Sequence, residues 1–183
     1  MVTINIFLNK SQTEKNLYKT FAGESRARNK YTFYAEEARC EGYRWVAEIF
    51  EETAENEKAH AREAIKRYLK KVKSTEWNLQ DAVKGEMEEN KKIYKEFEEV
   101  AEKEGFYEIA KFYKELREVE EEHEKRFLKL LDMIKKDRMF KSEENIMWQC
   151  MNCGYIYEGK EAPEHCPLCK YPREYFKHYC EIK

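Results

Sequence analysis

An internal repeat constrains the fold of this chain more than any other feature of its sequence. The segments GESRARNKYTFYAEEARCEGY and GEMEENKKIYKEFEEVAEKEGF align Gly23–Glu24 with Gly85–Glu86 and Gly42 with Gly105. The two glycines at the end of this alignment are one position further apart than the two at its start, so the second copy carries an extra residue. Inside a helix, an extra residue is commonly absorbed as a single π-helical turn. We therefore expect a π-bulge between the Gly-Glu pair of the second copy and Tyr94.

Four long stretches show apolar residues at every third or fourth position, which is typical of amphipathic helices. We expect these helices at about 13–40, 43–73, 79–104 and 106–138, with Gly42 and Gly105 ending two of them. The connections at these glycines are short, so the first and second helices should be antiparallel neighbours, as should the third and fourth. Polar residues 74–78 interrupt the pattern between the pairs. The predicted fold class is therefore mainly α, with an up-down four-helix bundle.

The apolar stripes of the four helices each carry one glutamate: Glu24, Glu57, Glu86 and Glu120. A carboxylate on a buried face needs a partner, because burial of an unpaired charge is costly. The helical region has only two histidines, and the motifs Glu57-x-x-His60 and Glu120-x-x-His123 put each on the same helix face as a glutamate. Either motif alone could be a solvated surface pair. Together, in register with the repeat, they match the ligand set of carboxylate-bridged di-iron bundles.

Three further residues extend this candidate site. Glu89 follows Glu86 by three residues, where the first copy has Ala27, so only the second copy offers an additional carboxylate on the metal-facing side. Taken alone, a glutamate such as Glu89 is more often a solvated surface residue. Tyr31 and Tyr94 lie two turns beyond the glutamates of the two Gly-Glu pairs. Their hydroxyls either hydrogen-bond a ligating carboxylate or a bound peroxide, or belong to ordinary core tyrosines.

Two Cys-x-x-Cys pairs separated by twelve residues predict a second metal site near the end of the chain, formed by Cys150, Cys153, Cys166 and Cys169. Two such pairs are a strong signal for a tetrahedral four-thiolate site. The spacing does not choose between iron, a one-electron carrier, and zinc, a structural ion. We assign residues 1–138 to the helical bundle, 139–147 to a linker, and 148–183 to a small module of strands and turns.

The charge balance and the termini bear on partners and location. With 35 basic and 37 acidic residues the net charge is −2, so no large field would attract nucleic acid or an anionic membrane. No apolar run approaches the roughly 18 residues of a membrane span, and the opening segment lacks the features of a signal peptide. We expect a cytoplasmic protein in which Cys40 and Cys180 are free thiols of unassigned role, and His165 and His178 are surface residues.

Five segments of the chain resemble those of the rubrerythrins, from about Phe21 to Phe176: AGESRARNKYTFYAEEARCEGY, EIFEETAENEKAH, GEMEENKKIYKEF, EEEHEKRFL and WQCMNCGYIYEGKEAPEHCPLCKYP. The resemblance implies a ferritin-like bundle with a di-iron site, followed by a rubredoxin-like domain with iron at its four cysteines. It further implies that Glu57 and Glu120 bridge the two irons, and that one iron exchanges between Glu89 and His60 when its redox state changes. The implied terminal ligands are Glu24, Glu86 and His123, with Tyr31 and Tyr94 as hydrogen-bond donors.

The function implied by the resemblance is a non-haem peroxidase that reduces hydrogen peroxide to water and protects an anaerobe from oxidative stress. Electrons would come from rubredoxin or an NAD(P)H-dependent rubredoxin reductase, through the cysteine-bound iron, within a head-to-tail homodimer or a larger assembly. Two other functions fit the residues, namely a ferritin-like ferroxidase that reduces oxygen, and a non-enzymatic interaction module with a zinc ribbon. Lys170 departs from rubredoxins, which carry glycine there, so we expect either a strained turn or an altered amide hydrogen bond.

Overall fold

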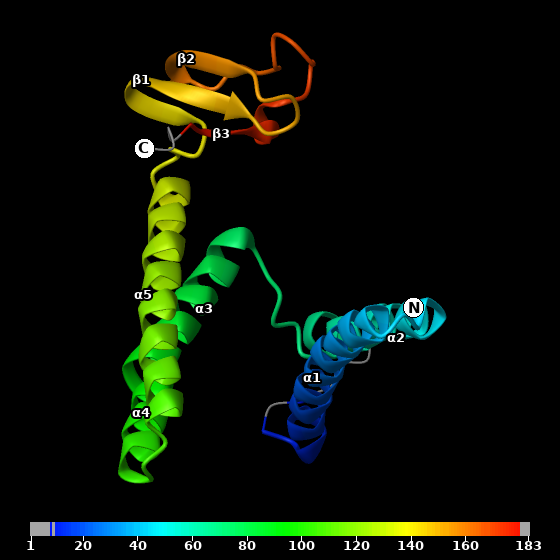
Figure 1. The fold of residues 1–183 in the computed structure, drawn as a ribbon. Helices are drawn as coiled ribbons and strands as arrows, with labels where there is room; N and C mark the ends of the chain where they lie inside the picture. Colours follow the sequence, from blue (N-terminus) through cyan, green and yellow to red (C-terminus); the bar gives the residue numbers. More distant parts are fainter. Residues whose placement is uncertain (1–7, 9, 180–183) are drawn as a thin grey trace. The chain divides into compact units, whose positions relative to one another are not determined.

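The computed structural model describes residue 8 and residues 10–179. A series of helices is followed by a small strand domain (Figure 1). The mainly α fold class is therefore confirmed. The chain divides into two compact units, residues 1–73 and residues 74–183. Cys180 and most of the opening segment lie outside the described residues, so the free thiol expected at Cys180 stays a prediction.

The first unit is a helix pair in which α1 (Gln12–Cys40) and α2 (Arg44–Arg62) lie side by side (Figure 1). Ser11 begins α1, because its hydroxyl accepts a hydrogen bond from the Glu14 backbone N–H at 3.0 Å. Gly42, with φ +86°, makes the reversal between the helices. The buried contact between the helices consists of small residues packed on one ring: Ala35, Ala38, Ala47 and Phe50. Alanine side chains allow the two backbones to approach closely.

The helix α2 ends earlier than the sequence predicted. It closes with the π-helical turn η1 (Glu63–Tyr68), not at residue 73. The Leu69 N–H bonds to the Ala64 carbonyl, five residues back, and Lys70 has a left-handed φ of +53°. A left-handed residue cannot continue the helix, so the apolar pattern beyond Tyr68 does not extend it.

The second unit begins with α3 (Thr75–Glu88), η2 (Glu89–Ile93) and α4 (Tyr94–Lys103), which pack against α5 (Tyr107–Lys135). Gly105, with φ +83°, makes the turn before α5. The expected start near residue 79 is wrong, and so is the polar break at 74–78. The Ser74 hydroxyl accepts a hydrogen bond from the Trp77 N–H at 3.3 Å, so these polar residues form the cap and the first turn of α3.

The π-helical turn predicted from the repeat is confirmed as η2, which follows the Gly-Glu pair of the second copy. Beyond it, aromatic rings occupy equivalent positions in the two helix pairs. Three rings contact one another in each pair: Tyr31, Tyr34 and Phe50 in the first, and Tyr94, Phe97 and Tyr113 in the second. Their centroid separations are 6.2, 6.1 and 5.5 Å in the first pair and 6.2, 6.1 and 5.4 Å in the second. The same local packing therefore occurs twice.

The strand domain is a three-stranded antiparallel sheet in the order β2-β1-β3, formed by β1 (Lys141–Cys150), β2 (Ile156–Glu161) and β3 (Phe176–His178). A short helical turn, η3 (Arg173–Tyr175), precedes β3. Its core consists of five buried residues: Trp148, Cys150, Ala162, Cys166 and Phe176. Strand β1 begins inside the segment 139–147 that we expected to be a linker, because Ile146 pairs with Gly159. The domain limits themselves stay a prediction.

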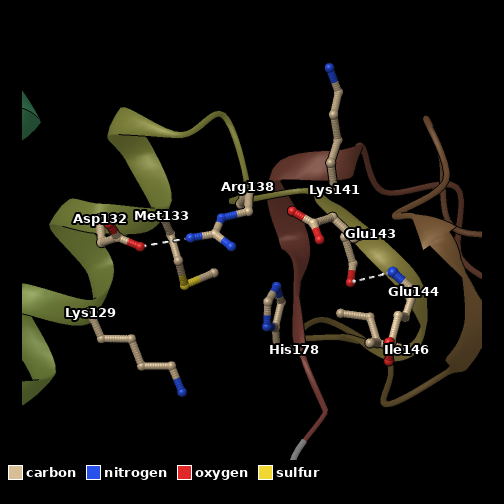
Figure 2. A pocket seen from close by; sticks show the side chains of 10 residues that line it. Lys129, Asp132, Met133, Arg138, Lys141, Glu143, Glu144, Ile146 and His178 are labelled. Atoms are coloured by element: carbon tan, nitrogen blue, oxygen red, sulfur yellow. Dashed lines mark hydrogen bonds and ion pairs between the residues drawn. The ribbon is translucent and has the colours of Figure 1, made fainter.

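A pocket lies between the last turns of α5 and strands β1 and β3 (Figure 2). Arg138 closes one side by donating to Asp132 at 2.8 Å. His178 packs edge-on against Trp148 with ring centroids 4.7 Å apart, and its Nε2 is buried without a hydrogen-bond partner. Burial, followed by the nearby Lys129 cation, lowers the pKa of His178. Of the two histidines expected at the surface, His165 is exposed, whereas His178 is half-buried with its Nε2 atom covered.

Candidate metal centres

The first group of candidate ligands, here called the first half-site, combines Glu24 of α1 with Glu57 and His60 of α2. The His60 Nδ1 atom lies 2.9 Å from a Glu57 carboxylate oxygen and 3.7 Å from a Glu24 carboxylate oxygen. The spacing of three residues in Glu57-x-x-His60 places both side chains on one face of α2, opposite Glu24. The first half-site therefore offers two carboxylates and one imidazole.

The second half-site combines Glu86 of α3 with Glu120 and His123 of α5. The His123 Nδ1 atom lies 2.8 Å from a Glu120 oxygen and 3.5 Å from a Glu86 oxygen. These separations closely match the 2.9 and 3.7 Å of the first half-site. Glu120 is buried, with 8% of its surface exposed. The structure thus brings six predicted ligands together in two groups of three with nearly the same internal geometry.

The carboxylates of each half-site crowd one another. A hydrogen bond with Glu57, followed by burial, raises the pKa of Glu24, and the same contact lowers the pKa of Glu57. Glu24 is therefore the weaker acid of the two carboxyl groups. Burial, followed by a hydrogen bond with Glu120, raises the pKa of Glu86. A bound cation would relieve this crowding, because it offsets the negative charge of the carboxylates.

Glu89 does not belong to the compact group of the second half-site, but it lies close to that group. It is the first residue of η2. Its charge helps to raise the pKa of Glu86, after the effects of burial and of Glu120. Burial, followed by the charge of Glu89, also raises the pKa of the Tyr94 phenol, and a hydrogen bond with Glu89 adds to this effect. Tyr94 therefore keeps its proton beside two of the candidate ligands.

Tyr31, the counterpart of Tyr94, has different polar surroundings. Its ring stacks on Phe50 with centroids 6.1 Å apart, and it contacts the Tyr34 ring at 6.2 Å. The first copy has Ala27 where the second has Glu89, so Tyr31 has no equivalent of the carboxylate next to Tyr94. The two tyrosines are thus equivalent in ring packing alone.

The four predicted cysteine ligands come together as one cluster: Cys150, Cys153, Cys166 and Cys169. The Sγ atoms of Cys150 and Cys169 are 3.7 Å apart, and those of Cys153 and Cys166 are 3.6 Å apart. Four sulfurs held about 2.3 Å from a central ion in a tetrahedron lie about 3.8 Å from one another. The sulfur positions therefore fit a tetrahedral iron or zinc ion.

The two Cys-x-x-Cys loops are built alike. The Gly154 N–H bonds to the Cys150 carbonyl at 2.8 Å, and the Lys170 N–H bonds to the Cys166 carbonyl at 2.9 Å. Both residues are left-handed, with φ +78° at Gly154 and +62° at Lys170. Of the two alternatives expected for Lys170, the strained turn is confirmed, and the amide hydrogen bond matches that of the glycine.

The thiols of the cluster have opposite acidities. A hydrogen bond from Asn152, followed by one from the Tyr171 backbone, lowers the pKa of Cys169 to about 6. At Cys153 the Tyr155 backbone N–H favours the thiolate, but burial and the neighbouring sulfurs outweigh it and raise the pKa to about 12. Crowded thiolates repel one another unless a cation lies between them. Our sequence reasoning missed Asn152, although its position between the first two cysteines was a signal.

Comparisons with known proteins agree with both centres. A family model described as Rubrerythrin matches residues 15–131, and one described as Rubrerythrin, rubredoxin-like domain matches residues 148–177. The rubrerythrin of Porphyromonas gingivalis is 44% identical over 180 residues, which are 91% of this chain and 90% of that protein. The chain belongs to the rubrerythrin family. Rubrerythrin-1 of Clostridium acetobutylicum is 43% identical over 183 residues, covering 91% of this chain and 94% of that protein.

Membership of the rubrerythrin family confirms the predicted fold class, a ferritin-like helical part followed by a rubredoxin-like domain. It also confirms the predicted cofactors, a di-iron centre and a rubredoxin-like four-cysteine iron site. Rubrerythrins are oxidoreductases that reduce peroxide, so the predicted function is confirmed at the level of the family.

A solved structure of nigerythrin in a partially reduced state aligns over 92% of this chain and 87% of that chain, with 29% identity and a TM-score of 0.36. A score this low carries no weight for the fold.

Among the described residues, no helix combines the length and apolar character that crossing a membrane requires.

Proposed function

We propose that this chain reduces hydrogen peroxide to water with a di-iron centre, and that each half-site supplies ligands to iron. The proposed ligands are Glu24, Glu57, His60, Glu86, Glu89, Glu120 and His123. The observation that carries the proposal is the matched geometry of the half-sites, each with two carboxylates and one imidazole around an Nδ1–carboxylate contact of 2.8 to 2.9 Å. Hard carboxylates and imidazoles in this number suit a pair of iron ions and leave positions for a small oxygen-containing substrate.

Bound iron would supply the redox chemistry, the two electrons that reduction of hydrogen peroxide requires. Glu57 and Glu120 would hold the iron together with Glu24, Glu86 and the two histidines, in the roles that the resemblance implies. Formation of two waters from hydrogen peroxide also consumes two protons. The Tyr94 hydroxyl is a group that can orient the substrate, because it keeps its proton beside Glu89 and can donate a hydrogen bond. Tyr31 is proposed for the same role in the first half.

Electrons would return to the bundle through iron at the four cysteines. In support, the cluster fits a single tetrahedral ion and lies in a domain that matches the rubredoxin-like family model. The outside donor we propose is rubredoxin or an NAD(P)H-dependent rubredoxin reductase. We also propose a cytoplasmic homodimer or larger assembly that protects an anaerobe from oxidative stress, with domain limits at 1–138, 139–147 and 148–183.

The test is metal analysis and rapid mixing of protein purified without oxygen. We expect about three irons per chain, and oxidation of the reduced di-iron centre by peroxide faster than by oxygen. The matched variants Glu57→Gln and Glu120→Gln should lose this reaction and keep the visible absorption of the cysteine-bound iron. Zinc at the cysteines would remove the electron path, and faster reaction with oxygen than with peroxide would favour a ferroxidase.

A further inference from the structure

The π-helical turn η2 frees a backbone carbonyl inside a helix. In an α-helix the Tyr94 N–H would bond to the carbonyl of Asn90, four residues back. In this structure it bonds to the carbonyl of Glu89, five residues back. The Asn90 carbonyl therefore loses its α-helical donor, and Asn90 is buried, with 8% of its surface exposed. A buried carbonyl without a donor is costly, so another group must supply one.

Arg117 of α5 supplies that donor. Its Nε atom donates to the Asn90 carbonyl at 2.9 Å, and its Nη1 atom donates to the Glu98 carboxylate at 2.6 Å. Both side chains of this ion pair are largely covered, with 28% of Arg117 and 17% of Glu98 exposed. The rigid fork of the guanidinium allows both bonds at once. Glu98 thus fixes Arg117, and Arg117 fixes the freed carbonyl.

The first helix pair shows what occupies these positions when no extra residue is present. In the alignment that matches Gly42 with Gly105, Arg117 corresponds to Ala54 and Glu98 corresponds to Ala35. Both alanines are buried, with 4% and 1% exposed. Helix α1 runs from Gln12 to Cys40 without a π-helical turn. The ion pair therefore occurs in the copy that has the inserted residue, and two alanines suffice in the copy that lacks it.

We propose that Arg117, anchored by Glu98, is a positioning residue that holds η2 in the register that directs Glu89 toward Glu86 and Tyr94. The inference rests on the proposed role of Glu89 as an iron ligand. Arg117 bonds to the backbone of the turn that begins with Glu89, and it acts on the site through that backbone.

Amide hydrogen exchange of the full-length, metal-free protein tests the backbone part of this proposal. In Arg117→Ala the amides of residues 89–94 should exchange about 10- to 100-fold faster, because a bond from a charged donor to a buried carbonyl is lost. The control is Lys111→Ala, which removes an exposed ion pair with Glu115 from the same helix. Equal exchange at residues 89–94 in both variants would overturn the proposal.

A second variant separates the lost carbonyl bond from the stray charge that Arg117→Ala leaves on Glu98. The double variant Arg117→Ala/Glu98→Ala creates the alanine pair that the first helix pair already packs at Ala54 and Ala35. It leaves no unpaired charge and should fold. We expect the fast exchange at residues 89–94 to persist. Recovery of wild-type protection in the double variant would show that Glu98, and not the Asn90 carbonyl, caused the effect.

Titration of the metal-free protein with Co²⁺ tests the link to Glu89. Arg117→Ala should weaken Co²⁺ binding at the carboxylate site about 10-fold, as loss of groups that orient ligands commonly does. Thiolate absorption from the four-cysteine site should stay unchanged and serves as the internal control. In a Glu89→Gln background, Arg117→Ala should weaken Co²⁺ binding only slightly further. If the losses of affinity in the two single variants simply add in the double variant, the proposal is overturned. If wild-type protein takes no Co²⁺ at the carboxylates, the proposed function fails, and hydrogen exchange still decides the role of Arg117.

Discussion

The two helix pairs of this protein share the arrangement of their candidate ligands, but the first helix of the second pair contains an inserted π-helical turn. Both pairs hold a glutamate opposite a Glu-x-x-His motif with closely matching separations. The second pair adds η2, an extra carboxylate at Glu89, and an ion pair where the first has two alanines. One inserted residue can thus make a duplicated set of candidate ligands unequal, without changing the separations that the two copies share.

The largest expected effect tests the equivalence of the half-sites. Glu57→Ala and Glu120→Ala remove corresponding carboxylates, and each should reduce peroxide-dependent turnover by more than about 100-fold, because the proposed function makes each an iron ligand. Iron content and rapid-mixing kinetics measure the outcome. If one variant kept most of its activity, the two half-sites would not contribute equally to the centre.

Substitutions at the buried helix contacts test whether the two helix pairs pack in the same way. Ala47 and Ala110 are equivalent positions with 0% and 4% of their surface exposed. Replacement of either by leucine should lower the free energy of unfolding by about 1 to 3 kcal/mol, because well-packed contacts do not accept added volume without strain. Chemical denaturation of the metal-free protein measures both changes. A loss confined to one variant would show that the two pairs pack differently.

Deletion of Asn90 tests the difference between the pairs. The deletion restores a single alignment throughout the repeat and should convert η2 into continuous α-helix. Glu89 is then no longer directed toward Glu86 and Tyr94 by the π-helical turn, and we expect peroxide reduction to fall about 10-fold. In the deletion variant, Arg117→Ala should no longer speed hydrogen exchange in this turn. Wild-type activity after the deletion would mean that the inserted residue has no functional role.

The smallest effect concerns pH. Because the pKa of Glu86 is raised in the folded metal-free protein, its contribution to stability is present below the ordinary carboxyl pKa and is lost as pH rises through the raised value. In the first pair, the pKa of Glu24 is raised and the pKa of Glu57 is lowered, so the two groups change stability with pH in opposite directions. The melting temperature of the metal-free protein should therefore fall as the pH rises above about 4.5. Glu86→Gln should make this fall smaller than Glu24→Gln does, and the two variants should differ by a few degrees at most.

Most of the site could be predicted from the sequence because ligand spacing and helix geometry are local. Glu57-x-x-His60 fixes two side chains on one face by itself, and the repeat locates both the partner glutamate and the π-helical turn. The start of α3 was missed because Ser74 acts through a capping bond, which polar composition disguises as a loop. The end of α2 was missed because a left-handed Lys70 leaves no mark in the apolar pattern.

Long-range contacts explain the other misses. Arg117 and Asn90 are 27 residues apart, and no periodicity within either helix indicates that they meet. A comparison of the repeat position by position would have found a clue, since a buried alanine pair in one copy is replaced by opposite charges in the other. Strand β1 was partly taken as a linker because residues 141–147 are mostly exposed and polar, and only their pairing with β2 makes them a strand.

The matched ring triads have a consequence for how such a helix can change over evolution. One added residue turns everything that follows it by about 100° around the helix axis. The agreement of the Tyr94, Phe97 and Tyr113 separations with those of the first triad shows that this rotation has been cancelled within a single turn. The rest of α4 consequently returns to its original phase. An insertion that would otherwise move every later side chain to another face of the helix thus alters the surroundings of one carboxylate.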